Sequence, residues 1–168
     1  MKKITTLLLF VFSMMSLKAQ YQKATFSFSP SLIVPTGLLS FAHRIGFGAE
    51  ITATLPYSEN VSFYGSTGIG VLLGKKLNYG DGYSETNSNA TYIPFIVGAK
   101  YQSNQIYGGM GFGYASYNFG EGDSESGLSI RPEFGFDLNK KVTVKAMYTT
   151  TMSNFNIDQF SFGASIKL

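Results

Sequence analysis

The sequence contains a single histidine, His43, and no cysteine, so few side chains can titrate near neutral pH. A histidine that acts as a general base needs a partner within hydrogen-bond distance. No motif places a hydroxyl group, such as that of Ser40, beside His43. Side chains alternate between the two faces of a strand, so His43 would lie on the same face as the apolar Ile45. We therefore interpret His43 as an interfacial or loop residue and not as a catalytic base.

Charged side chains within the alternating segments form a second candidate site. All of them fall on one face of the expected strands: Arg44, Glu50, Lys100, Arg131, Glu133, Asp137, Lys145 and Lys167. Such a set could be catalytic or could line a pore. Charges removed from water require partners, because unpaired burial is severely unfavourable. We interpret all of them except Arg44 as members of structural polar networks inside the barrel. One network, near mid-height of the barrel or above, would contain Glu50, Arg131 and Glu133. The other, nearer the periplasm, would contain Lys100, Asp137, Lys145 and Lys167.

Two further patterns could suggest a ligand site. Gly109, Gly111 and Gly113 resemble a phosphate-binding loop only in composition, because their spacing of two is that of a strand face and no helix follows. Acidic residues that could bind divalent cations occur between the expected strands: Asp81, Glu85, Glu121, Asp123 and Glu125. They lack the spacing of a metal site, so we expect solvated loop tips, no bound metal and no cofactor.

The elements that must position these residues are strands. Apolar and polar residues alternate with period two almost throughout the chain, which predicts half-buried β-strands. We expect eight: Ala24–Val34, Arg44–Leu55, Val61–Leu73, Thr91–Tyr101, Ile106–Tyr117, Leu128–Leu138, Val142–Thr151 and Gln159–Leu168. Strands of this length exceed the usual ~5–6 residues of soluble proteins and match the ~9–11 residues that cross a bilayer when tilted.

The connections between the expected strands alternate in length. Pro56–Asn60, Gln102–Gln105 and Asn139–Lys141 are tight and polar. The other four are looser: Pro35–His43, Leu73–Thr91, Gly120–Gly127 and Met152–Asp158. Alternation of short and long connections is typical of outer-membrane barrels, which have short periplasmic turns and longer extracellular loops.

The two faces of the strands differ in side-chain size. One face carries large apolar residues, such as Phe134 and Phe162. The other carries all the charges and ten strand glycines, and only Gly65 and Gly108 lie on the apolar face. An eight-stranded barrel has an interior that side chains just fill. The polar, glycine-rich face is therefore expected to line the lumen and the apolar face to contact lipid. A soluble lipocalin-like barrel would reverse this arrangement and is the alternative.

The first residues resemble an export signal. Lys2 and Lys3 precede an apolar stretch, Ile4–Leu17, which is too short to span a bilayer, and Ala19 is a small residue before the expected cleavage site. We expect a signal peptide at residues 1–19 and a barrel domain at 20–168. Three of the 13 basic residues lie in this signal, so ten basic and ten acidic residues remain. The net charge of zero does not favour nucleic-acid binding.

Taken together, the Lys18-Ala19-Gln20 signal end, the eight alternating segments and the aromatic last strand resemble the small outer-membrane β-barrel families common in Bacteroidota, broadly similar to OmpA/OmpX-type barrels. The last strand departs from the usual assembly signal, because it ends in Leu168 and not in Phe. The resemblance implies an all-β, eight-stranded antiparallel up-and-down transmembrane barrel. It also implies insertion by the outer-membrane assembly machinery and contact with outer-membrane lipid.

Two classes of function remain open at this point. One is a structural or surface-interaction barrel without enzymatic activity, whose loops meet the exterior or an extracellular or periplasmic protein partner. The other is a barrel enzyme, like the lipid A deacylases and omptin-type proteases that use histidine, or a narrow transport protein. Activity against membrane lipids that is abolished by His43→Ala would favour the second class.

Overall fold

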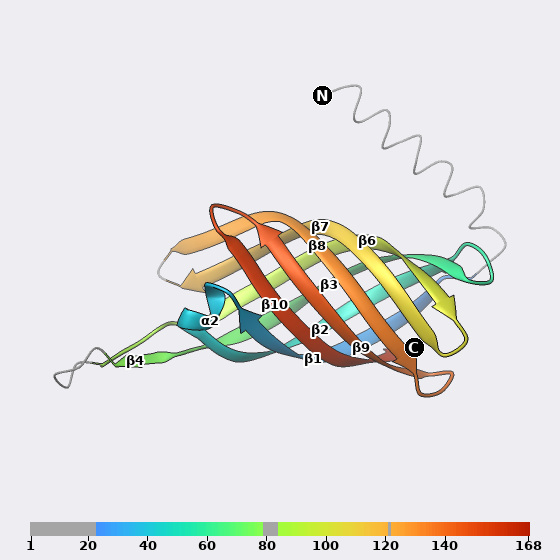
Figure 1. The fold of residues 1–168 in the computed structure, drawn as a ribbon, viewed down its shortest axis with the longest axis horizontal. Coiled ribbons are helices and arrows are strands. Elements are labelled where there is room, and N and C mark those ends of the chain that lie inside the picture. Colours follow the sequence, from blue (N-terminus) through green and yellow to red (C-terminus); the bar gives the residue numbers. More distant parts are fainter. Residues whose placement is uncertain (1–22, 79–83, 121) are drawn as a thin grey trace, which may run out of the picture.

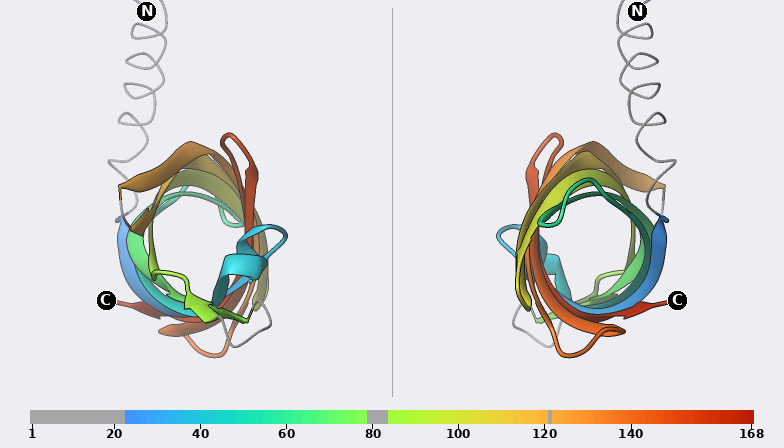
Figure 2. Two further views of the ribbon diagram at one scale, coloured as in Figure 1. Left: turned by 90° about the vertical axis from the view of Figure 1, so that its left-hand side faces the viewer. Right: turned by 90° about the vertical axis from the view of Figure 1, so that its right-hand side faces the viewer.

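Eight long antiparallel strands close into a barrel, in the order β1-β10-β9-β8-β7-β6-β3-β2 (Figures 1 and 2). The computed structural model describes residues 23–78, 84–120 and 122–168. The barrel strands are β1 (Thr25–Thr36), β2 (His43–Pro56), β3 (Val61–Gly74), β6 (Ala90–Ser103), β7 (Ile106–Gly120), β8 (Asp123–Asp137), β9 (Val142–Met152) and β10 (Asn156–Lys167). The predicted eight-stranded antiparallel barrel is therefore confirmed.

The two ends of the barrel differ. At one end, called here the loop end, the short helix α2 (Leu39–Ala42) lies at the rim, and the hairpin of β4 (Lys76–Asn78) and β5 (Ser84–Thr86) extends beyond it (Figure 1). At the other, the turn end, residues 57–60, 104–105 and 138–141 make tight connections. The described residues contain no helix long and apolar enough to cross a membrane. The predicted signal peptide lies outside the described residues, as do Asp81 and Glu121.

The parity predicted for the two faces holds along most of each strand. On β8, Phe134 is 55% exposed on the outer surface, whereas Glu133 is 7% exposed and faces the lumen. The outer surface carries large apolar side chains from every barrel strand, including Phe28, Phe47, Ile69, Phe95, Phe112, Phe134, Val144 and Phe162. A continuous apolar band of this kind is what a strand barrel presents to lipid.

A bulge at the start of β2 reverses the faces predicted for two residues. His43 pairs with Gly74, and Gly46 pairs with Leu72, so three steps along β2 match two along β3. The extra residue turns His43 inward, where it is 5% exposed, and leaves Arg44 exposed. The predictions that His43 is a loop or interfacial residue on the outer face and that Arg44 faces the lumen are therefore wrong. Glycine is needed here, because a Cβ at Gly46 would lie 2.4 Å from the carbonyl oxygen of Val71.

The connection between β7 and β8 is shorter than predicted. The polar segment Gly120–Gly127 was expected to be a loop, but β8 begins at Asp123. Its first residues pair with the end of β7, as in Ser116↔Ser126. Gly120 and Gly122 adopt positive φ values of 86° and 92° in the turn, which glycine does without strain. β8 thus continues beyond the end of β9, whose last residue, Met152, pairs with Leu128. Asp123 stands at the loop end of the barrel.

Candidate functional site

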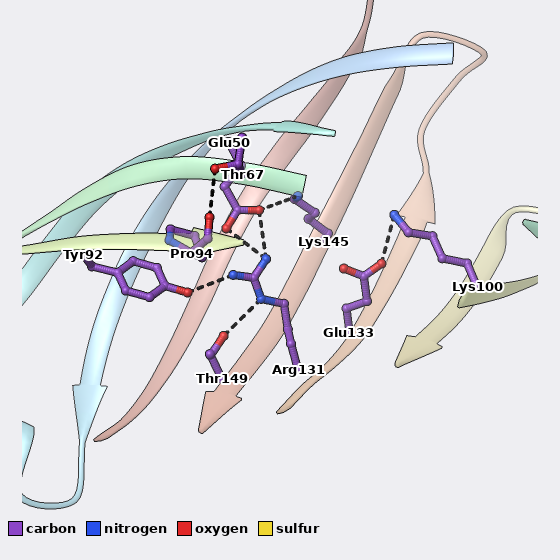
Figure 3. A network of polar contacts seen from close by, with 9 residues as sticks. All are labelled: Glu50, Thr67, Tyr92, Pro94, Lys100, Arg131, Glu133, Lys145 and Thr149. Atoms are coloured by element: carbon purple, nitrogen blue, oxygen red, sulfur yellow. Dashed lines mark hydrogen bonds and ion pairs between the residues drawn. The ribbon is translucent and has the colours of Figure 1, made fainter. Parts of the chain in front are cut away.

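The centre of the lumen is occupied by one buried arginine (Figure 3). Arg131 of β8 is 1% exposed. Its Nη1 lies 3.0 Å from Oε1 of Glu50 and donates a hydrogen bond to Oε2 at 3.1 Å. Its Nη2 donates to the Tyr92 hydroxyl at 2.8 Å, and its Nε donates to Oγ1 of Thr149 at 3.2 Å. Lys145 lies 3.8 Å from the same Glu50 carboxylate, which therefore interacts with two cations.

A second ion pair lies nearer the turn end. Nζ of Lys100 is 2.9 Å from Oε1 of Glu133. The same ammonium lies 4.4 Å from the ring centroid of Tyr64 and 4.8 Å from that of Tyr107, within cation–π range. Both rings are buried in the lumen and pack against the Lys100 ammonium.

The pairing of these charges differs from the grouping expected from the sequence. Glu133 was placed with Arg131 and Glu50, and Lys145 with the lower group. In the structure Glu133 contacts Lys100, and Lys145 approaches Glu50 (Figure 3). Parity gives the face of each residue but not the neighbour that reaches it across the lumen, because that depends on the tilt and register of distant strands.

The turn end of the lumen is open and polar. A cavity of about 320 Å³ there is lined mainly by hydroxyl, amide and charged side chains, among them Lys100, Asp137 and Lys167. Asp137 accepts hydrogen bonds from the Thr143 hydroxyl and from Nε2 of Gln102, the latter at 2.8 Å. Of the seven residues predicted to form lumen networks, Lys100, Asp137 and Lys167 thus line this cavity, and Lys100 also belongs to the second ion pair.

The loop end of the lumen is filled by apolar side chains. The buried cluster comprises Ile33, Leu39, Leu72, Ala90, Tyr92, Ala115, Tyr117 and Ile157, with Phe119 packed against it. Aromatic rings run through it in a column. The distance between ring centroids is 4.8 Å from Tyr92 to Tyr117, 6.2 Å from Tyr117 to Phe119 and 5.6 Å from Phe119 to His43. Because Tyr92 also binds Arg131, the column connects the central charges to the loop end.

A pocket of about 520 Å³ opens above this cluster. It is lined by residues from the connections and strand ends of the loop end, including Leu39, His43, Phe119, Asp123 and Phe155. The backbone of Leu39 and of Ser88 lies near the His43 ring. Within the described chain, however, neither imidazole nitrogen makes a hydrogen bond of normal geometry.

The two kinds of site considered from the sequence, a histidine with a hydroxyl partner and a metal cluster, can be compared with the structure. The Ser40 hydroxyl donates to the carbonyl oxygen of Gly37 at 2.7 Å and does not bond His43. No group of three or more His, Cys, Asp or Glu side chains in the part of the chain that the structure describes could hold a metal ion.

Comparisons with known proteins agree with this geometry. The profile of the family described as "Outer membrane protein beta-barrel domain" matches residues 4–167. The chain belongs to this family. No curated protein matches the sequence.

The fold is shared with several solved outer-membrane barrels. Ail of Yersinia pestis, solved in complex with the heparin analogue sucrose octasulfate, is 12% identical with a TM-score of 0.56, over 88% of this chain and 99% of Ail. The N-terminal β-barrel domain of Pseudomonas aeruginosa OprF is 9% identical with a TM-score of 0.58, over 88% and 99% of the two chains. Neisserial surface protein A is 12% identical with a TM-score of 0.51, over 86% and 96%. At these identities the likeness concerns the fold.

Membership of the family orients the molecule. Outer-membrane barrels have short periplasmic turns and longer extracellular loops, so the loop end is extracellular and the turn end is periplasmic. The apolar cluster therefore lies at the extracellular end of the lumen and the polar cavity at the periplasmic end.

The apolar lumen cluster was missed by the sequence analysis, although the signal was present. Ile33, Leu72, Tyr92 and Tyr117 share the parity of the lumen glycines, yet they are large and apolar or aromatic. All four lie in the third of their strands next to the longer connections. Several large apolar residues gathered on the polar face near one end indicate a local core inside the barrel at that end.

Proposed function

We propose that this outer-membrane barrel is closed to solutes and serves as a structural or surface-interaction protein. The observation that carries the proposal is the packing at the extracellular end of the lumen. Leu72, Ala90, Ala115, Tyr117 and Ile157 are each 0% exposed, although they belong to four different strands. Side chains in close contact across the lumen leave no aqueous path there.

The central ion pairs support the same proposal. Arg131 and Glu50 connect β8 to β2 across the lumen, which are not neighbours in the barrel. Their Coulomb interaction and hydrogen bonds are strongest when water is excluded. We infer a structural role for them, because a pore for ions requires charged groups that remain hydrated and exchange partners.

The proposal includes the export and assembly of the chain. We propose cleavage of a signal peptide near Ala19–Gln20, insertion by the outer-membrane assembly machinery, and contact of the apolar outer surface with outer-membrane lipid. The resemblance to small barrels common in Bacteroidota belongs to the same proposal. An extracellular or periplasmic protein partner would bind the hairpins and turns that project from the two rims. The mass of the membrane-bound protein tests the cleavage, and an intact Met1 would contradict it.

Conductance measurements test the closed barrel. We expect purified protein in planar lipid bilayers to show no stable single-channel currents, with an open porin reconstituted in the same way as the positive control. Folding is confirmed beforehand by the shifted mobility of unheated protein on a denaturing gel. Large, stable currents from the folded protein would contradict the proposal and favour a transport function.

A further inference from the structure

The extracellular pocket has the size and lining of a site for a small ligand. Its volume of about 520 Å³ falls within the ~300–1,000 Å³ that is usual for ligand pockets. Such pockets combine apolar walls with a few polar groups that orient the ligand. Here the walls are Leu39, Phe119 and Phe155, and the polar groups include His43 and Asp123.

The imidazole of His43 indicates that the pocket is built to be occupied. The side chain is 5% exposed, and among the described residues its two nitrogens lack hydrogen bonds of normal geometry. A neutral imidazole can donate one hydrogen bond and accept one. The backbone of Leu39 and of Ser88 approaches the ring without full hydrogen-bond geometry. A polar group of a ligand in the pocket would complete the hydrogen bonding of at least one nitrogen.

The remaining lining sets the chemistry of the ligand. The ring centroids of Phe119 and His43 lie 5.6 Å apart, and Phe119 presents an aromatic surface to the pocket. Phe155 adds a second ring from the β9–β10 connection. Asp123 is exposed at the wall and makes no ion pair within the described residues. A carboxylate in the same lining as aromatic rings favours a cation, and the rings favour a planar or apolar body.

We propose that this pocket binds a small aromatic amine, with its ring against Phe119, its ring polar group at His43 and its ammonium group at Asp123. The inference goes beyond the structural role proposed above and needs no protein partner. The ligand would come from outside the cell, because the apolar cluster closes the pocket from the lumen below.

Tryptamine is a suitable probe, because it carries an indole N–H, an aromatic ring and an ammonium group. The protein itself contains no Trp, so indole fluorescence excited beyond the tyrosine band reports the probe alone. Equilibrium dialysis of tryptamine against protein in phosphatidylcholine vesicles gives the bound fraction, with empty vesicles subtracting partition into lipid. Indole-3-acetate has the same ring with a negative charge and serves as the matched probe.

We expect saturable binding of tryptamine, and about tenfold weaker binding of indole-3-acetate, because its charge is repelled by Asp123. Asp123→Asn should weaken tryptamine binding about threefold, the effect of one partly solvated charge. Glu59→Gln makes the same change of charge at the opposite end of the barrel and should have no effect. His43→Phe keeps the ring beside Phe119 but removes the nitrogens, and should weaken binding about fivefold.

Ala42→Leu provides an independent test, since Ala42 lines the pocket and a larger side chain would fill part of it. Binding should fall at least about tenfold while the folded mobility on a gel is kept. The absence of saturable binding above empty vesicles would overturn the proposal, as would unchanged binding by Ala42→Leu. Equal binding of the two probes together with no effect of Asp123→Asn would overturn it as well. None of these results affects the closed barrel, which conductance tests separately.

Discussion

The two halves of the lumen are stabilised by different means. The extracellular half is a small apolar core in which Leu72, Tyr117 and Ile157 exclude water. The periplasmic half is polar and contains a cavity of about 320 Å³ with Asp137 and Lys167 at its wall. Both halves are built from the same eight strands, so the difference comes from the side chains that occupy one face. A narrow barrel can thus be closed at one end and hydrated at the other without a change of backbone.

Arg131 lies at the boundary between the halves, and its replacement should cause the largest loss of stability. Arg131→Met would leave Glu50 buried with only Lys145 nearby, at 3.8 Å. Removal of one partner of a buried pair should destabilise the barrel by about 3–5 kcal/mol. Arg44→Met is the matched control, because Arg44 is exposed, and should change stability by less than about 0.5 kcal/mol. Urea unfolding in lipid vesicles measures both. Equal stability of the two variants would mean that the central cluster is dispensable.

The apolar half can be weakened alone. Leu72→Ala should destabilise the barrel by about 2–5 kcal/mol, because Leu72 is fully buried and its truncation leaves a cavity. Its neighbour Leu73 is 42% exposed on the outer surface. Leu73→Ala should cost less, because lipid fills the space that the shorter side chain leaves. The same unfolding titrations separate the two. A larger effect at Leu73 would show that Leu72 does not belong to a packed core.

On the lipid-facing surface, substitutions in the two halves of the barrel should have similar effects on stability. Phe47 lies in the extracellular half and Phe134 in the periplasmic half, and they are 61% and 55% exposed. Phe47→Arg and Phe134→Arg should each destabilise the barrel by up to about 2–4 kcal/mol, depending on depth. Phe134→Leu should be mild, since lipid accepts either apolar side chain. Refolding yields and unfolding titrations provide the measurement. Wild-type folding of Phe134→Arg together with a defect in Phe134→Leu would mean that the outer face is not in lipid.

The smallest change in stability is expected for a substitution at the wall of the polar cavity. Lys167 is exposed near the end of β10, so Lys167→Gln should change stability by less than about 0.5 kcal/mol. Lys100→Gln should cost more, because it leaves the Glu133 carboxylate without the ammonium at 2.9 Å. A large effect at Lys167 would extend the buried network to the periplasmic rim and remove the contrast between the two halves.

Much of this fold follows from parity alone. Because strand side chains alternate strictly, Phe134 and Glu133 could be assigned to opposite faces from the sequence. The same rule failed at His43 and Arg44, since one bulged residue reverses it and nothing in the local composition marks the bulge. The start of β8 was missed because Gly, Ser and acidic residues are typical of loops, whereas pairing with β7 holds them in a strand.

The candidate sites were less predictable than the fold. The partners of each lumen charge depend on contacts between strands that are distant in sequence, as between Glu50 on β2 and Arg131 on β8. The extracellular pocket could not be foreseen, because it is assembled from strand ends and connections that are distant in sequence and share no pattern. His43 was singled out as the only histidine, but its burial beside Phe119 is visible only in three dimensions.

Thiol accessibility along the lumen tests the division between the halves most directly. The chain has no cysteine, so Ala42→Cys, Ala115→Cys and Ser165→Cys each carry a single thiol in the extracellular pocket, the apolar cluster and the periplasmic cavity. Folded variants in detergent micelles expose both ends of the barrel to a water-soluble maleimide. We predict rapid labelling of the first and third. Ala115→Cys should react about a hundredfold more slowly, because its thiol reacts only through local opening. Labelling of Ala115→Cys at the rate of Ser165→Cys would contradict a sealed extracellular half.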